Sequence, residues 1–224
     1  MKILFGIIRY FIAKIPFVRH YSTKGHQVFW LRENREVYWE NYAKTWKHPH
    51  RNIISKILSF FPWFSLIEIG CGSAPNLINI IQHFPGKQLG GIDINPVALQ
   101  VANKQLQGAL FKVGSGDDML MSDKSSDVLL YDMFLIYVGP FKIKKYLEEA
   151  KRIARNYIVL CEFHNESLWN RLQLRIFSGK HAYNYKKLLG KMGFYDIILY
   201  KMPILEKDND QKFRYIITAR VPKK

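Results

Sequence analysis

Cysteine is nearly absent from this chain, and acidic residues are few. Cys71 and Cys161 are too few and too far apart for a disulfide scaffold or a cysteine-rich metal site, so we expect a cytoplasmic protein without a metal centre. The 34 Lys and Arg residues outnumber the 18 Asp and Glu residues, which gives a formal net charge of +16. This charge suits either an anionic partner (nucleic acid, a membrane surface or a phosphorylated substrate) or a merely solvated basic surface.

A long uninterrupted apolar run is also absent. Residues 1–18 are mostly apolar, but Lys2, Arg9 and Lys14 interrupt them, so neither a membrane-spanning helix nor a signal peptide is predicted. On a helical wheel the basic side chains form a thin strip. Such a helix either packs on the domain or on a second subunit, or lies in a membrane interface and makes the protein peripheral at the inner face of the membrane. This pattern does not predict an oligomeric state.

Two regions follow from the distribution of apolar residues. Residues 1–26 form the basic apolar segment and residues 27–224 form one domain, for which an apolar content of 48% is ample. The domain is expected to open with helices in residues 28–60, with a break near Pro49. The helices expected there are Val28–Lys47 and Asn52–Phe60.

Beyond Pro62, short apolar runs alternate with longer amphipathic stretches, which is the pattern of repeated βα units. The expected strands are Ser65–Ile69, Gln88–Ile92, Leu110–Val113, Asp127–Tyr131, Tyr157–Glu162, Tyr195–Tyr200 and Phe213–Ala219. The expected helices are Asn76–His83, Pro96–Gln105, Ile143–Arg152 and Tyr185–Met192. The connection at Lys207–Gln211 is too short for a helical crossover, so the last two strands must pair antiparallel. We therefore predict a single α/β domain with a seven-stranded, mostly parallel sheet, a C-terminal antiparallel pair and helices on both faces.

The first strand leads into a glycine-containing loop. Gly70 and Gly72 let the backbone turn tightly and let a ligand approach closely. Ser73 is expected to cap the next helix, whose positive end then points at the ligand. The third glycine of a dinucleotide-binding loop would fall at Pro75, which instead fits a first helical turn. Glu68, two residues before the loop, suits a ligand with an ammonium group and repels a pyrophosphate.

This motif, an apolar run, an acid and then Gly-x-Gly-x-Ala, resembles the first motif of the class I S-adenosylmethionine (SAM)-dependent methyltransferases, which have a Rossmann-like domain. The resemblance extends from about residue 36 to the C-terminus. It implies that SAM is the cofactor. It also implies that Glu68, Gly70, Cys71 and Gly72 line the amino-acid end of the cofactor.

The resemblance assigns further cofactor residues to the next two loops. Asp93, at the end of the second strand, can accept both ribose hydroxyl protons, with Ile94 beside it. The alternative is that Asp93 only caps the helix that follows. After the third strand, Gly116 and Asp117 are expected to meet the adenine, because Ser115 stands where the family has its usual Asp.

The fourth and fifth strands bring further polar residues to the carboxyl edge of the sheet, where open α/β folds place ligands. Tyr131 is expected to contact the cofactor, and Asp132 and Tyr137 the methyl acceptor. Tyr137 occupies the second position of a His-His pair that many small-molecule relatives carry. His164 ends the fifth strand at the same edge, and its ordinary pKa suits proton removal, so it is the expected base. A buried structural histidine is the alternative.

An aromatic stripe precedes the first strand. Trp39, Tyr42 and Trp46 recur at helical steps, at the place where the family has a helix that covers the active site. Such a stripe more often packs in the core, and we favour that interpretation for at least two of the three residues.

The sequence thus predicts an enzyme that moves a methyl group from SAM to an oxygen or nitrogen of a small-molecule acceptor. A local likeness of residues 156–165 to methyltransferases of bacterial surface-sugar biosynthesis points to a sugar or other surface-polymer precursor. One alternative is a nucleic-acid methyltransferase, for which the positive charge argues. Another is a SAM-binding or membrane-docked protein without turnover.

Overall fold

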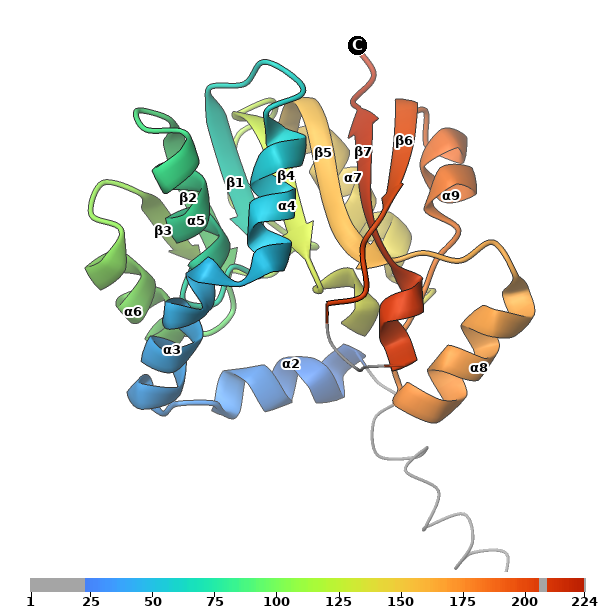
Figure 1. Cartoon of the computed structure of the whole chain (residues 1–224), viewed down its shortest axis with the longest axis horizontal. Coiled ribbons are helices and arrows are strands. Elements are labelled where there is room, and N and C mark those ends of the chain that lie inside the picture. Colours follow the sequence, from blue (N-terminus) through green and yellow to red (C-terminus); the bar gives the residue numbers. More distant parts are fainter. Residues whose placement is uncertain (1–22, 206–208, 224) are drawn as a thin grey trace, which may run out of the picture.

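The computed structural model describes residues 23–205 and 209–223. Its centre is a seven-stranded sheet in the order β3-β2-β1-β4-β5-β7-β6 (Figure 1). The strands are β1 (Ser65–Ile69), β2 (Gln88–Asp93), β3 (Leu110–Val113), β4 (Ser126–Asp132), β5 (Ala154–Phe163), β6 (Tyr195–Lys201) and β7 (Arg214–Arg220). Strands β1 to β5 pair in parallel, and β7 runs antiparallel to both β5 and β6. The predicted fold class is confirmed.

Helices cover both faces of this sheet. The helical segments are α2 (Thr23–Arg32), α3 (Glu36–Ala43), η1 (Lys44–Lys47), α4 (Pro49–Leu58), α5 (Pro75–His83), α6 (Pro96–Gln105), η2 (Leu135–Tyr137), α7 (Ile143–Ile153), α8 (Leu168–Ser178), α9 (Tyr185–Lys191) and η3 (Asn209–Phe213). Helices α4, α5 and α6 contribute to the core on one face, and α7 and α9 contribute to the core on the other. The sheet is therefore buried on both sides, as a parallel sheet requires.

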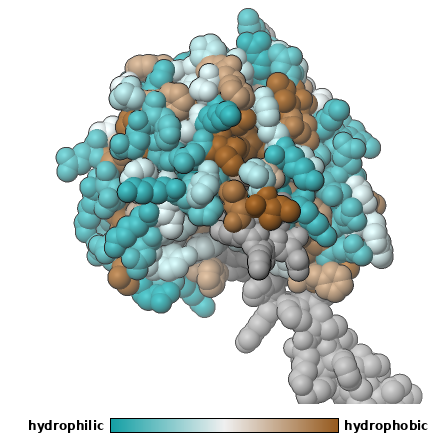
Figure 2. Space-filling view, viewed as in Figure 1, coloured by the Kyte–Doolittle hydropathy of each residue, from teal (hydrophilic) through white to brown (hydrophobic). Residues whose placement is uncertain are grey.

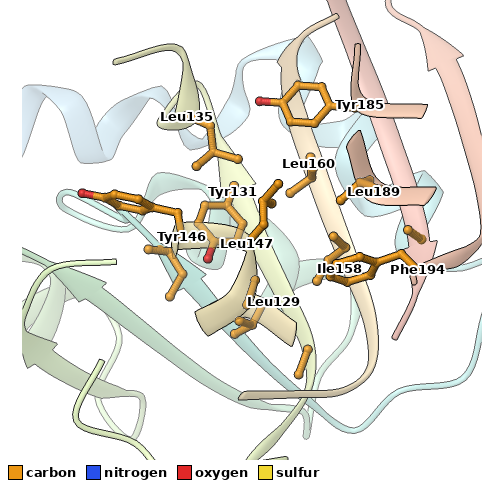
Figure 3. Packing of buried hydrophobic residues seen from close by; sticks show 14 of the residues in the cluster. Leu129, Tyr131, Leu135, Tyr146, Leu147, Ile158, Leu160, Tyr185, Leu189 and Phe194 are labelled. Carbon is orange, nitrogen blue, oxygen red and sulfur yellow. The ribbon is translucent and has the colours of Figure 1, made fainter. Parts of the chain in front are cut away.

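The central strand β4 shows why the sheet forms. Its residues 126–131 are all buried, and residues 128–131 form the continuous apolar run that a strand covered on both faces needs. On the α7 face, Leu129 and Tyr131 pack against Leu147 and the neighbouring Ile158 (Figure 3). The alternate residues Val128 and Leu130 belong to the core on the opposite face.

The predicted helix Val28–Lys47 is interrupted. Helix α2 ends at Arg32 and α3 begins at Glu36. The carbonyl oxygens of Trp30 and Glu33 accept hydrogen bonds from the side chain of Asn95, at 2.6 and 2.8 Å. Because this partner is distant in sequence, the turn is stabilised by a tertiary contact that helical periodicity does not reveal.

Helix α8 is absent from the prediction although its ends carry ordinary helix signals. The hydroxyl of Ser167 accepts the N–H of Asn170 as an N-cap, and Gly179 ends the helix with φ of +70°. Between these caps, leucine and isoleucine recur at four-residue steps. These signals were sufficient to predict the helix.

The carboxyl ends of the parallel strands point to one end of the molecule. Helix α2 crosses at this end, and α8 also lies there (Figure 1). The face shown in Figure 2 is largely hydrophilic, with apolar side chains gathered toward its centre. Across the described ranges, no helix combines the length and apolarity needed to cross a bilayer. Residues 1–18, for which an interfacial helix is one prediction, lie outside the described residues.

Candidate active site

A cleft opens at the carboxyl edge of the sheet, under helices α2 and α3. Its interior volume is about 220 Å³, and the cleft is open to solvent. Its lining residues are Trp30, Tyr38, Trp39, Tyr42, Ile69, Gly70, Gly72, Ile92, Asp93, Ile94, Gly114, Ser115, Gly116, Asp132, Met133, Phe134, Tyr137, Val138 and Tyr146. Loops that follow the strands form one wall, and aromatic side chains form much of the other.

The glycine loop after β1 requires its glycines. Gly70 has φ of +74°, and a Cβ there would lie 2.2 Å from a ring carbon of Phe134. Gly72 has φ of +53°, and a Cβ there would lie 3.1 Å from the ring of Trp39. Left-handed backbone and close neighbours both exclude larger residues, so the loop presents bare backbone to the cleft.

The helix after the loop begins differently from the prediction. Ser73 does not cap α5, because its hydroxyl donates to the carbonyl oxygen of Trp39 at 2.7 Å. Ala74 takes the N-cap position in left-handed backbone, and Pro75 stands in the first turn as predicted. The Ser73 bond instead ties the glycine loop to α3, which covers the cleft.

Asp93 closes β2 and lines the cleft. One carboxylate oxygen accepts the N–H of Gly72 and the other accepts the N–H of Asn95, both at 2.8 Å. Burial raises the pKa of Asp93, and these backbone donors offset part of the rise. Each oxygen can accept a further hydrogen bond, so the carboxylate can still receive two hydroxyl groups.

Beneath the cleft, one amide links two carboxyl groups. Asn76 donates from Nδ2 to Glu68 at 2.6 Å and to Asp132 at 2.9 Å, and its oxygen accepts from Arg51 at 2.5 Å. Burial raises the pKa of Glu68 to about 8, so this side chain is protonated at neutral pH. Glu68 lies below the loop, outside the cleft lining, and its Oε2 has no hydrogen-bond partner among the described residues.

Asp132 lines the cleft and stays ionised. Its Oδ2 lies 3.0 Å from Nε2 of His50 and 3.6 Å from the guanidinium of Arg51. Burial acts to raise the pKa of Asp132, but the contacts with His50, Arg51 and Asn76 outweigh burial and hold the pKa well below its usual value. An acid of this strength is a poor proton acceptor, so Asp132 provides a fixed negative charge.

Sequence reasoning missed the residues that hold Asp132 in place. Pro49 does not only break a helix: it begins α4 and sets His50 and Arg51 in the first turn. Proline is favoured at this position because its missing N–H costs nothing there. That signal would have started the predicted helix at Pro49 instead of Asn52 and drawn attention to both side chains.

His164, the predicted base, lies outside the cleft. The side chain is buried, its Nδ1 accepts the N–H of Tyr185 at 3.2 Å, and its ring packs edge-on against Tyr215. Burial lowers its pKa. The structure therefore does not bring His164 together with Asp132 and Tyr137, which both line the cleft. His164 is a buried histidine that packs in the protein interior, which is the alternative given in the sequence analysis.

Two predicted cofactor residues point away from the cleft. The side chain of Tyr131 is fully buried in the core on the α7 face (Figure 3). Neighbouring strand residues face opposite sides of a sheet, so Tyr131 and Asp132 cannot both reach one site. Cys71 is also buried, and its Sγ would lie 2.5 Å from a Cβ at Gly91. Only the backbone of Cys71 belongs to the loop.

The loop after β3 divides the predicted adenine residues. Gly116 lines the cleft, as do Ile94 and Ser115. The carboxylate of Asp117 accepts the Ser115 hydroxyl and lies 3.7 Å from the ammonium of Lys145, and Asp117 is not part of the cleft lining. A direct contact of the Asp117 side chain with a ligand in the cleft is therefore not supported by this arrangement.

The loop that carries Tyr137 is held by a buried acid. Glu162 of β5 accepts the backbone N–H groups of residues 134–136, at 2.9, 2.8 and 3.2 Å. Burial raises the pKa of Glu162 to about 8. These bonds fix η2 against β5 and set Phe134 and Tyr137 on the cleft wall.

The aromatic wall comes largely from α2 and α3, which we call the lid. Trp30 of α2 approaches Tyr137 with 6.3 Å between ring centroids. Trp39 and Tyr42 of α3 line the cleft. Of the three residues of the aromatic stripe, only Trp39 is buried. The interpretation of at least two of them as core packing is therefore incomplete.

Asn95 fastens the lid to the cofactor loops. Its Nδ2 donates to the carbonyl oxygens of Trp30 and Glu33, and its Oδ1 accepts the N–H of Ala98 at 3.0 Å. Its backbone N–H donates to Asp93. One side chain thus caps α6 and joins the end of β2 to the lid.

Residues 66–156, which carry the loops after β1 to β4, match a family model described as a methyltransferase domain. This region is therefore similar to a methyltransferase domain, over 91 of the 224 residues of the chain. No curated protein matches the chain. The match agrees with the family expected from the sequence, and the matched region contains the glycine loop, Asp93 and Asp132.

Solved structures share the fold of this chain at low sequence identity. A chain from the complex between the Haloferax volcanii Trm112 methyltransferase activator and the putative methyltransferase is 16% identical, with a TM-score of 0.66, covering 87% of this chain and 98% of that one. The magnesium protoporphyrin IX methyltransferase from Synechocystis with bound SAM is 15% identical, with a TM-score of 0.56, covering 77% and 80%. A possible histamine N-methyltransferase from Thermotoga maritima is 15% identical, with a TM-score of 0.57, covering 84% and 97%. For three longer methyltransferases the chain spans 54%, 57% and 59% of their length.

The cofactor of this class of methyltransferase is SAM, and the cleft fits it. Asp93 has lone pairs for two ribose hydroxyls. If the amino-acid end of the cofactor lies at Gly70, as the family resemblance implies, the absent side chain there leaves backbone open to it, and the charge of Asp132 would suit its ammonium group. Ile94 and Gly116 also line the cleft.

Proposed function

We propose that the methyltransferase transfers a methyl group from SAM to an oxygen or nitrogen of a small-molecule acceptor. The observation that carries this proposal is the aromatic wall of the cleft. Its members are Trp30, Tyr38, Trp39, Tyr42 and Tyr137. Aromatic faces pack against flat or apolar faces of small molecules, including the C–H faces of a sugar ring. A sugar or other surface-polymer precursor is therefore an acceptor of suitable chemistry.

The charge of the cleft supports a small acceptor over a nucleic acid. Among its described lining residues the charged side chains are Asp93 and Asp132, and none is Lys, Arg or His. The Lys and Arg side chains of the described residues thus lie outside the cleft lining. A polyanion entering the cleft would meet two carboxylates and no cation, whereas binding of nucleic acid depends on basic side chains that neutralise phosphates.

The side chains of the cleft suit a mechanism of alignment. SAM, when bound, supplies an electrophilic methyl group. Burial raises the pKa of Tyr137, so its hydroxyl stays protonated and can orient an acceptor by hydrogen bonding. The depressed pKa of Asp132 makes it a poor base. In this mechanism a proton released by the acceptor passes to solvent at the cleft mouth.

Methyl-labelled SAM tests the proposal even though the acceptor has not been identified. The protein is incubated with labelled SAM and a cell extract separated into small molecules and nucleic acid. We expect label in the small-molecule fraction, with the product identified by mass spectrometry, and no transfer by Asp93→Ala. Label in nucleic acid alone, with binding that weakens steeply with salt, would overturn the proposed acceptor class.

Calorimetry separates the remaining alternatives. The wild-type chain should bind both SAM and S-adenosylhomocysteine. Binding of both without labelled product in any fraction would indicate a SAM-binding protein without turnover. Binding of neither would refute the methyltransferase function itself.

A further inference from the structure

Helix α8 carries apolar side chains on the side that faces away from the protein. Leu168, Leu172 and Ile176 follow one another at four-residue steps and so form one stripe. We define the outer stripe as Leu168, Trp169, Leu172, Ile176 and Phe177, whose exposed fractions are 63%, 66%, 40%, 46% and 83%. Leu174, on the opposite side of the helix, is buried in the cluster around Phe163.

This orientation is the reverse of an ordinary surface helix, which buries its apolar stripe. In α8 a single leucine anchors the helix to the core, and the larger apolar surface faces outward. Contiguous exposed apolar surface on a folded protein marks a site of interaction. We therefore expect the outer stripe to bind a partner.

The charges around the stripe identify the chemistry of that occupant. Helix α8 contains Arg171 and Arg175 and no acidic residue, and Glu166 precedes it by two residues. Helix α2 exposes Phe29 and Leu31 and also contains no acidic residue. The first acidic residue of the whole chain is Glu33. The Lys and Arg residues that precede it are Lys2, Arg9, Lys14, Arg19, Lys24 and Arg32.

We propose that α8, together with α2, docks the methyltransferase on an anionic membrane surface. Tryptophan, phenylalanine and leucine on one helix face, with arginine beside them, are the composition of a helix that lies in a lipid interface. A second copy of this chain would bring basic surface against basic surface. Residues 1–22 also carry Lys and Arg and no acidic residue. Neither a second copy nor residues 1–22 would therefore complement the charge of α8 and α2, whereas anionic lipid would.

The placement of the two helices gives the docking a direction. Both lie at the end of the molecule to which the carboxyl ends of the parallel strands point (Figure 1). The cleft opens at that same edge of the sheet. Docking through α2 and α8 would therefore turn the cleft toward the bilayer.

Vesicle flotation of the full chain tests the docking surface. Phosphatidylcholine vesicles with and without phosphatidylglycerol are compared for wild type, for the double variant Trp169→Glu with Ile176→Glu, and for Leu110→Glu. Leu110 is 76% exposed on β3, at the opposite edge of the sheet from the strands next to α8. Circular dichroism and SAM calorimetry check that each variant is folded.

We expect wild type and Leu110→Glu to float only with anionic vesicles. The double variant should lose binding by at least about tenfold, because it places two carboxylates against the lipid. Equal flotation of the double variant and wild type, or none by wild type, would overturn the proposal. A wild-type dimer that the double variant dissociates, without flotation, would assign the stripe to a second copy instead. Flotation needs no turnover, so this test stands apart from the proposed transfer reaction.

Discussion

Replacing Asn95 by Asp would separate the two roles of this side chain. The Oδ1 atom caps α6 by accepting the N–H of Ala98, and Asp is as good an N-cap as Asn. The Nδ2 atom donates to the carbonyl oxygens of Trp30 and Glu33, and Asp offers no donor there. The substitution should therefore loosen the lid while α6 keeps its cap.

The expected cost follows from the bonds that are lost. Removing each buried hydrogen bond costs about 1 kcal/mol, and more where a carbonyl is left without any donor. The Trp30 oxygen keeps the N–H of Glu33 at 3.3 Å, and the Glu33 oxygen keeps the indole N–H of Trp39 at 2.9 Å. Because neither carbonyl loses all of its donors, we expect the two lost bonds to cost about 1 kcal/mol each, or about 2 kcal/mol of free energy in total. This cost corresponds to roughly 30-fold more frequent opening of the lid.

Hydrogen exchange resolved by peptide measures this effect locally. In Asn95→Asp, peptides from residues 23–43 should exchange faster and peptides from 96–105 should not change. Asn95→Ala is the matched variant, because it loses the cap as well and should loosen both regions. The reasoning is refuted if the lid of Asn95→Asp exchanges as slowly as in wild type, or if α6 loosens to the same degree as the lid.

Three further predictions concern the cofactor loops. Gly70→Ala should lower the free energy of unfolding by about 3 kcal/mol, because the new methyl group strains the backbone and contacts Phe134. Gly86 also has positive φ but no atom within 4 Å of a Cβ, so Gly86→Ala should lower the free energy of unfolding by only about 1 kcal/mol. Denaturant titration of both variants measures the difference. Asp93→Asn should weaken SAM binding by at least about tenfold in calorimetry, and unchanged affinity would exclude a ribose contact. Because burial raises the pKa of Glu68 from 4.5 to about 8, the folded chain holds an extra proton between these values and loses stability as pH rises, by up to about 1.4 kcal/mol per unit. Glu162, whose pKa burial also raises to about 8, adds a slope of the same sign. Glu68→Gln should therefore remove only the Glu68 share of the slope, and an unchanged slope between about pH 5 and about pH 9 would contradict the shift.

The parts of the fold that local chemistry determines were predictable. The bounds of β1, β3 and α6 agree with the structure, because apolar runs and the Asn-Pro start of α6 are local signals. The break between α2 and α3 was not predictable from periodicity. It depends on Asn95, which lies 65 residues beyond Trp30 in the sequence.

The cofactor site was more predictable than the acceptor site for a similar reason. A glycine loop and the acid that ends β2 occupy backbone positions that the fold itself sets. The direction of a side chain past a strand end depends on strand length and alternation. Strand β5 extends to Phe163, and the following His164 turns toward Tyr185 instead of the cleft.

The floor of the cleft shows how a basic protein maintains a negative site. Two carboxyl groups that share one amide donor cannot both ionise cheaply in a buried place. His50 and Arg51 both lie within 3.6 Å of Asp132, whereas Glu68 accepts its hydrogen bond from the neutral amide of Asn76. The guanidinium of Arg51 and the hydrogen bonds from His50 and Asn76 thus select Asp132 as the charged partner and leave Glu68 protonated. A positively charged cofactor therefore meets a fixed negative charge at the floor, and Arg51, the cation paired with Asp132, lies outside the cleft lining and does not compete for the cleft.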